Sequence, residues 1–91
     1  MLVGVPKEIK VLEHRVGLTP ASVREVVHHG HQAIVERDAG QGIGASDDDY
    51  ARAGATIAAT ASEVWAKAQL IVKVKEPQAA ERALLTPGQL L

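Results

Sequence analysis

Two lysines one residue apart, Lys73 and Lys75, end an apolar run in the segment IVKVKEP (residues 71–77). A strand over residues 69–75 would place both ammonium groups and Ile71 on one face, because side chains alternate along a strand. Ligands of open parallel sheets bind beyond the carboxyl ends of the strands, so such lysines can meet a small anion. The competing interpretation is a strand that surfaces, with its lysines extended into water. The pattern by itself favours this second interpretation.

Arg15 lies in a charged connection that follows the first apolar run and is therefore expected near the same edge of the sheet. Its guanidinium fork suits a carboxylate, which it can hold through two parallel hydrogen bonds. Taken alone, Arg15 fits better an exposed or ion-paired arginine, with Glu13 or Glu8 as the partner. Arg15 and Lys75 together are more informative, since adjacent strands can bring both to one pocket that binds a carboxylate.

The stretch GQGIGA (residues 40–45) formally matches the G-x-G-x-x-A fingerprint of dinucleotide-binding loops, and we reject that match. The helix expected after it begins with Ser46 and three aspartates, which would repel a pyrophosphate. A true fingerprint also follows an apolar strand directly, whereas three charged residues intervene here. The glycines are expected to serve a turn with positive φ.

Three histidines, His28, His29 and His31, raise the question of a metal site. His28 and His29 would point about 100° apart on a helix, and His31 lies beyond the glycine that ends it, so the three are poorly placed for one ion. A helix C-terminus favours histidine through the helix dipole, which explains them without a metal. No Ser/His/Asp set, P-loop or aromatic stacking platform is present, and we expect neither a metal nor a catalytic residue.

The composition indicates one small globular domain. The chain has 91 residues, of which 46% are apolar, with no Phe, one Trp and one Tyr, so the core is expected to consist of small side chains. The net charge is −1 without a basic stripe, which argues against nucleic acid and membrane surfaces as partners. The lack of cysteine fits a reducing compartment, and no apolar stretch approaches the roughly 20 residues that span a bilayer. A cytoplasmic protein is expected.

Strand and helix patterns alternate along the chain and predict an α/β fold, with a mostly parallel, Rossmann-like or flavodoxin-like sheet and flanking helices. The chain ends on the apolar run QLL without a terminator, so the sheet is expected to be incomplete and the chain a fragment. Three helices are predicted from capping residues at Thr19, Ser46 and Thr60. The predicted strands are residues 2–6, 31–37 and 69–75, with a brief one at 55–58.

The segment GVPKEIKVLEHRVGLTPASVREVVHHGH (residues 4–31) strongly resembles the N-terminal signature of alanine dehydrogenases and the related α subunits of proton-translocating nicotinamide nucleotide transhydrogenases. That signature runs Gly-aliphatic-Pro-x-Glu, then Asn-Glu, then Arg-Val-Ala-x-Thr-Pro. AGQGIGASDDDYARAGA (39–55) and VWAKAQLIVKVKEP (64–77) are similar to the family as well, so the resemblance covers essentially the whole chain. Leu12 and Gly17 depart from the usual Asn and Ala, which can loosen the loop that carries Arg15.

The resemblance implies an oxidoreductase, NAD-dependent L-alanine dehydrogenase, which reversibly deaminates L-alanine to pyruvate and ammonia. It implies that Arg15 binds the substrate carboxylate and that Lys75 contacts the carboxylate or carbonyl oxygen, while Lys73 has a structural or ion-pair role. Residues 1–91 would be the N-terminal part of the substrate domain, inactive alone. The catalytic histidine, a catalytic aspartate and the NAD-binding domain of the family come later, and no cofactor-binding residue is expected here. The family forms homo-oligomers, commonly hexamers.

Two alternatives remain open from the sequence. The first is a fragment of a transhydrogenase α subunit, although these usually carry Asn at the position of Lys75. The second is a non-catalytic module that stands alone, keeping the pocket without the chemistry. The role of Lys73, the oligomeric state and the reason for the chain end at Leu91 are not fixed by the sequence.

Overall fold

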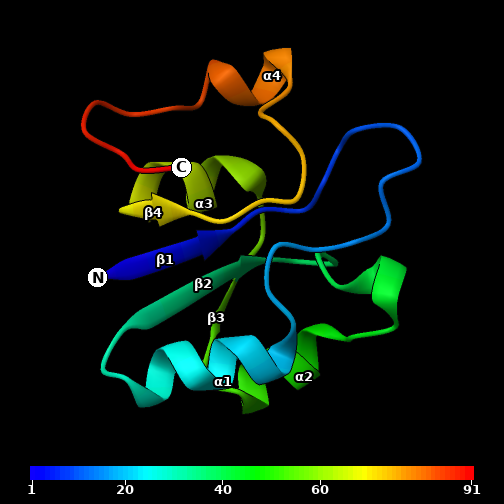
Figure 1. The fold of residues 1–91 in the computed structure, drawn as a ribbon, viewed down its shortest axis with the longest axis vertical. Coiled ribbons are helices and arrows are strands. Elements are labelled where there is room, and N and C mark those ends of the chain that lie inside the picture. Colours follow the sequence, from blue (N-terminus) through cyan, green and yellow to red (C-terminus); the bar gives the residue numbers. More distant parts are fainter.

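Four parallel strands form one sheet in the computed structural model, which describes all 91 residues (Figure 1). β1 (Leu2–Val5) and β2 (Gln32–Glu36) pair in the centre of the sheet. β3 (Thr56–Ala58) flanks β2, and β4 (Leu70–Ile71) flanks β1, so that the strand order is β3-β2-β1-β4. The parallel α/β sheet predicted from the sequence is confirmed.

Helices cover both faces of this sheet (Figure 1). α1 (Pro20–His28) and α2 (Asp47–Arg52) lie on one face. α3 (Ala61–Lys67) lies on the other face, and the short α4 (Ala79–Arg82) lies beyond the β4 edge of the sheet. None of these helices has both the length and the apolar character needed to span a bilayer.

Alternation along the central strands divides the core into two clusters. Val35 packs toward α1 and α2, whereas its neighbour Ile34 packs toward α3. Each cluster contains one fully buried aromatic residue, Tyr50 in the first and Trp65 in the second. The remaining members are Val, Ile and Ala, as the composition predicts. The first cluster is Val5, Val16, Val23, Ala33, Val35, Ala39, Tyr50 and Ala53, and the second is Ile34, Ala58, Val64, Trp65, Ala68 and Ile71.

Capping residues start the first two helices as predicted. Thr19 Oγ1 accepts the Ser22 N–H at 3.2 Å, and proline occupies the first turn of α1, where a missing N–H leaves no donor unpaired. Ser46 and Asp49 form a reciprocal capping box at the start of α2, with N···O distances of 3.1 and 2.9 Å. Local sequence therefore fixes where these helices begin.

Thr60 and Glu63, three residues apart, have the sequence pattern of a capping box, but at α3 this box is only half formed. Thr60 Oγ1 accepts the Glu63 N–H at 3.3 Å, so the helix still starts where the sequence indicates. The Glu63 carboxylate does not return the hydrogen bond to Thr60. It accepts the N–H of Ala59 and the ammonium of Lys67 instead, at 3.3 and 2.9 Å, because Lys67 lies one helical turn further along.

The last strand is shorter than predicted, since β4 ends at Ile71 and the predicted strand reaches Lys75. The Gly4 carbonyl of β1 accepts the N–H of Val72 at 2.9 Å. Because alternate residues of a central strand face each neighbour, Pro6 is the next residue toward β4, and it has no N–H to donate. The ladder stops at this point. The prediction that both lysines share one face of a strand is therefore wrong.

The glycine-rich residues 40–45 form a turn and not a dinucleotide-binding loop. They contain the 3₁₀ helix η1 (Gln41–Ile43), and Gly44 has a φ of 76°, the positive value expected for a turn. A Cβ on Gly42 would overlap the backbone of His14, so glycine allows this loop to approach the connection between β1 and α1. The helix that follows, α2, carries three aspartates in its first turn. These residues do not fit a pyrophosphate.

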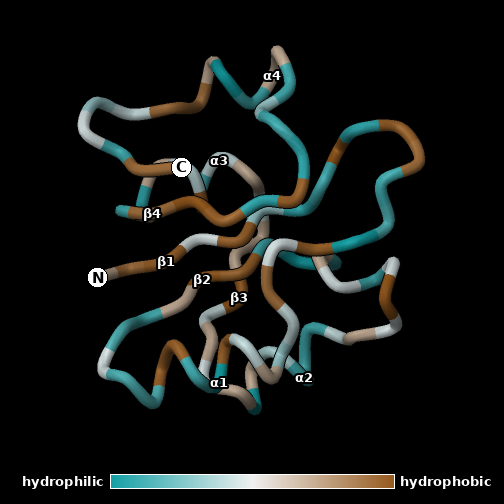
Figure 2. Tube along the Cα trace, in the orientation of Figure 1, coloured by the Kyte–Doolittle hydropathy of each residue, from teal (hydrophilic) through white to brown (hydrophobic).

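Leu12 lies in the β1–α1 loop, beside the equally exposed Val11. Figure 2 shows a short apolar stretch at the outer end of this otherwise mostly hydrophilic loop. The φ of Leu12 is 66°, and its exposed fraction is 84%, so no burial offsets the left-handed backbone. That conformation costs most L-residues about 1–2 kcal/mol, while Asn tolerates it. Leu12→Asn is therefore expected to raise the free energy of unfolding by about 0.5–1 kcal/mol. Thermal and urea unfolding of the purified protein would measure the change.

Val11→Asn is the matched control for this substitution. Val11 is 85% exposed and adjacent to Leu12, but it has no positive φ. If both variants raise the free energy of unfolding equally, the effect comes from the removal of exposed apolar surface, and the backbone explanation is contradicted.

Candidate carboxylate-binding site

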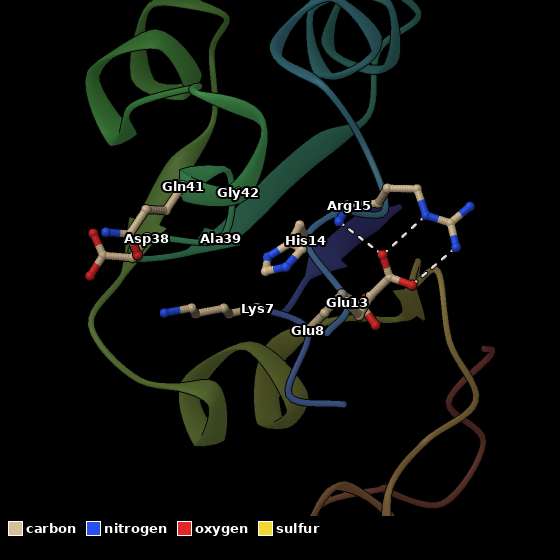
Figure 3. Close-up of a pocket in the computed structure, with 9 residues that line it drawn as sticks. All are labelled: Lys7, Glu8, Glu13, His14, Arg15, Asp38, Ala39, Gln41 and Gly42. Atoms are coloured by element: carbon tan, nitrogen blue, oxygen red, sulfur yellow. Dashed lines mark hydrogen bonds and ion pairs between the residues drawn. The ribbon is translucent and has the colours of Figure 1, made fainter. Parts of the chain in front are cut away.

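Two cavities open at the carboxyl edge of the sheet, and both are lined by Glu13, His14 and Arg15. The first, of about 300 Å³, lies toward η1 and is drawn in Figure 3. The second, of about 450 Å³, lies toward the segment that follows β4. The further lining residues of the first are Lys7, Glu8, Asp38, Ala39, Gln41 and Gly42, and those of the second are Lys10, Val11, Leu12 and Lys75.

Arg15 forms a two-point ion pair with Glu13 between these cavities (Figure 3). Arg15 Nε lies 3.0 Å from Glu13 Oε2, and Arg15 Nη2 lies 3.0 Å from Glu13 Oε1. The Arg15 backbone N–H also donates to Glu13 Oε2 at 2.9 Å. The Arg15 side chain is 68% exposed and that of Glu13 only 5%. The arginine therefore presents its fork at the surface, already shaped to a carboxylate.

Lys75 approaches the same carboxylate, at the oxygen that also contacts Arg15 Nη2. Its Nζ lies 3.9 Å from Glu13 Oε1, and its side chain is 38% exposed. Arg15 and Lys75 line one cavity, so the structure brings together the two residues that the sequence paired. Glu13, which the sequence offered only as one possible partner of Arg15, joins them. Two cations around one carboxylate leave one positive charge, which favours a small anion.

Lys73 lies elsewhere. Its side chain is 4% exposed, and its Nζ is 2.8 Å from Glu8 Oε1 and 3.2 Å from Glu81 Oε2. The carboxylates of Glu8 and Glu81 are equally enclosed, with 2% and 4% of their side chains exposed. The ion-pair role expected for Lys73 is confirmed, whereas Glu8, the other partner considered for Arg15, belongs to this buried cluster.

Sequence reasoning gave no role to Glu8 beyond that possible pairing. Besides Lys73, the Glu8 carboxylate accepts the backbone N–H groups of Val74 and Lys75, at 3.1 and 3.3 Å. The only signal in the sequence was indirect: a lysine directly after an apolar run needs an anionic partner if it is buried. Which of the eleven acidic residues supplies it could not be read from spacing.

The histidines are divided between the two edges of the sheet. His14 lines both cavities, although the sequence gave it no role. His28 and His29 end α1, and His31 Nδ1 lies 3.4 Å from the Met1 amino group, which places these three at the amino edge. No group of three or more His, Asp or Glu side chains is placed to hold a metal ion.

Glu13 makes the stability of the protein depend on pH. Hydrogen bonds from the Arg15 side chain, and then from its backbone N–H, lower the pKa of Glu13 from 4.5 to about 2. A carboxyl with a lowered folded-state pKa stabilises the protein fully above its unfolded pKa, and this contribution is lost as pH falls. At pH above 4.5, wild type should have a higher urea midpoint of unfolding than Glu13→Gln. We expect this difference to shrink as the pH falls from 4.5 to about 2.

Urea unfolding of both proteins across this pH range would measure that difference. Glu25→Gln is a suitable control, because Glu25 is exposed on α1 and lies 3.7 Å from His29 without an arginine partner. A constant difference between wild type and Glu13→Gln from pH 5 to pH 2 would contradict the assignment of the lowered pKa to Glu13.

Comparison with known proteins identifies the fold and the family of this segment. The family described as alanine dehydrogenase/PNT, N-terminal domain, matches residues 4–91. The chain is 53% identical to the alanine dehydrogenase of Halomonas elongata and 48% identical to that of Mycolicibacterium smegmatis. Each match covers 100% of this chain and 24% of the relative, so the chain spans about a quarter of the length of these curated relatives.

Two solved structures share the fold. An L-alanine dehydrogenase superposes with a TM-score of 0.91 at 49% identity, over 94% of this chain and 24% of the other. A transhydrogenase from Sinorhizobium meliloti superposes with a TM-score of 0.89 at 33% identity, over 97% of this chain and 25% of the other. The family match covers nearly every residue, including the loops that carry Arg15 and Lys75. The chain belongs to the alanine dehydrogenase/PNT N-terminal domain family.

Proposed function

We propose that this chain is the N-terminal part of the substrate domain of an NAD-dependent L-alanine dehydrogenase, an oxidoreductase that interconverts L-alanine with pyruvate and ammonia. Relatives named alanine dehydrogenase, 53% and 48% identical along the whole chain, support this activity. The observation that carries the proposal is the meeting of Arg15 and Lys75 at one cavity, where both contact the carboxylate of Glu13. The excess positive charge there suits a 2-oxo acid.

In this proposal, Arg15 orients the substrate. Its guanidinium already makes a two-point contact with a carboxylate, that of Glu13, and can offer its exposed edge to the carboxylate of pyruvate or alanine. Two parallel hydrogen bonds fix the direction of the bound molecule as well as its position. The substrate carboxylate would use the Nη1–Nη2 edge of the guanidinium, because Glu13 occupies the Nε–Nη2 edge.

Lys75 acts on the reacting oxygen. Its ammonium group is a compact positive charge on a flexible stem, and in the cavity it can lie against the carbonyl oxygen of pyruvate. A positive charge at this position stabilises the negative charge that develops on the oxygen as ammonia adds to the carbonyl carbon. That oxygen then leaves as water, and the carbon is reduced as a C=N group. Arg15 therefore binds the carboxylate of the substrate, and Lys75 contacts its carbonyl oxygen.

The residues of this chain do not fit NAD. The glycine-rich loop forms η1 and leads into a helix of six residues that begins with three aspartates, where a pyrophosphate would be repelled. We propose that NAD and the catalytic acid–base groups belong to other parts of the full-length protein. The homo-oligomer, with a hexamer as the common form, and the cytoplasmic location stay predictions from the family resemblance and the composition.

An assay of the purified full-length protein tests the activity. We expect oxidation of NADH that requires both pyruvate and ammonia, and reduction of NAD by L-alanine in the reverse direction. The similarity to a transhydrogenase structure makes hydride exchange between the two nicotinamide nucleotides the second activity to assay. Exchange without any alanine or pyruvate turnover would favour the transhydrogenase. If the folded protein shows neither activity, the result would favour a binding module.

A further inference from the structure

In the segment after β4, backbone N–H groups donate to a side chain, whereas in a strand they would donate to the backbone of the neighbouring strand. Past Ile71 the ladder cannot continue, because Pro6 of the adjacent segment has no N–H. The N–H groups of Val74 and Lys75 donate instead to the two oxygens of Glu8, at 3.1 and 3.3 Å. Glu8 thus replaces a strand partner for the two residues that place the Lys75 side chain.

Burial of the Glu8 carboxylate is possible because of Lys73. The Lys73 ammonium lies 2.8 Å from Glu8 Oε1, and both side chains are almost completely enclosed. A buried carboxylate needs a counter-charge and hydrogen bonds on its oxygens, and Lys73 together with the two N–H groups provides them. Glu81 contributes a second carboxylate to the ammonium and also accepts the N–H of Gln78 at 3.0 Å, which ties the cluster to the start of α4.

We infer that Glu8 is a positioning residue for Lys75, with Lys73 as its counter-ion, and that the two together set where the Lys75 ammonium stands in the cavity. This inference rests on the substrate role proposed for Lys75. It explains why two lysines stand one residue apart. Lys73 neutralises the carboxylate that holds the backbone of Lys75, and Lys75 is left 38% exposed beside Glu13.

A merely structural role for Glu8 would make a different prediction. If Glu8 only stabilised the fold, Glu8→Gln would lower stability without a specific effect on use of the oxo acid. If Glu8 acts through Lys75, its replacement should matter only while Lys75 is present. A double-mutant cycle separates the two cases, because it reports the coupling between the two side chains.

The experiment uses Glu8→Gln, Lys75→Ala and the double variant in the full-length protein, assayed for pyruvate-dependent NADH oxidation. We expect Glu8→Gln to lower kcat/KM for pyruvate about tenfold in the wild-type background and less than twofold in the Lys75→Ala background. Its loss of thermal stability should be the same in both. An equal fold-change in both backgrounds, or none in either, would overturn the positioning role.

Hydrogen exchange supplies a readout that does not need activity. The amides of Val74 and Lys75 should exchange about tenfold faster in Glu8→Gln than in wild type. Glu63→Gln is the matched control, since Glu63 also takes one lysine ammonium and one backbone N–H, but on α3. Unchanged exchange at residues 74 and 75 would overturn the inference directly. If the amides exchange faster in Glu8→Gln but the wild-type protein does not turn over pyruvate, the proposed function is refuted and the hydrogen bonds of Glu8 are established.

Discussion

Replacing Arg15 or Lys75 by alanine in the full-length protein should lower kcat/KM for pyruvate by about 100- to 1000-fold in each case. The reason is the loss of a charged contact to the substrate, at a cavity where Arg15 offers an exposed fork and Lys75 a half-exposed ammonium. Arg15→Ala should act mainly through a higher KM, because the fork binds the unreactive carboxylate. Lys75→Ala should act mainly through a lower kcat, because the ammonium stabilises charge that develops during reaction.

Steady-state kinetics with varied pyruvate, at saturating ammonia and NADH, would measure both effects. Arg15→Lys separates charge from geometry, since lysine keeps the positive charge but cannot make two parallel hydrogen bonds. It should recover only a small part of the loss. Arg24→Ala and Lys67→Ala are controls for charge, because they remove exposed cations from α1 and α3, and they should change kcat/KM less than twofold. Wild-type kinetics for Lys75→Ala would remove Lys75 from the site.

Lys73→Met should destabilise the protein by about 3–5 kcal/mol, the cost of breaking a buried ion pair by removing one partner. The substitution keeps the length of the side chain but leaves the enclosed carboxylates of Glu8 and Glu81 without their shared cation. The amides of β1 and β4, the paired strands that lead into Glu8 and Lys73, should open more readily. Native-state hydrogen exchange of these strands would measure the free energy of opening in wild type and variant.

Lys67→Met provides the comparison. Lys67 makes an equally short ion pair with Glu63, at 2.9 Å, but its side chain is 58% exposed. Exposed pairs of this kind contribute about 0.3–0.5 kcal/mol, so this variant should be close to wild type. The double variant Lys73→Met, Glu8→Gln should recover part of the loss, because it removes one of the two carboxylates left without a partner. Equal, small effects of Lys73→Met and Lys67→Met would contradict the buried cluster.

Much of the fold could be predicted because its signals are local. The N-cap residues Thr19 and Ser46 each bond a backbone N–H three residues further on, so a window of four residues locates a helix start. The alternation of Val35 and Ile34 between two clusters likewise follows from the geometry of a single strand. The pairing of Arg15 with Lys75 needed one more assumption, that the carboxyl ends of parallel strands meet at one edge.

The prediction failed where one segment depends on another that is distant in sequence. The apolar pattern of residues 69–75 is that of a strand, but Pro6, more than sixty residues earlier, ends the ladder that such a strand needs. Strand alternation then no longer applied, and Lys73 and Lys75 came to lie in different surroundings. The half-formed capping box at Thr60 has a local cause instead, since the Glu63 carboxylate accepts from Ala59 and Lys67, each four residues away.

The sequence alone determined the order of strands and helices, the parallel sheet, and the two cations that meet at its carboxyl edge. Only the tertiary structure decided which carboxylates form ion pairs with these cations. Glu13 pairs with Arg15 and Lys75. Glu8 and Glu81 pair with Lys73. The physical reason is that burial and charge compensation are set by groups brought together from distant parts of the chain. The local sequence around a lysine does not show whether the lysine is buried, because its burial requires a carboxylate from another segment of the chain.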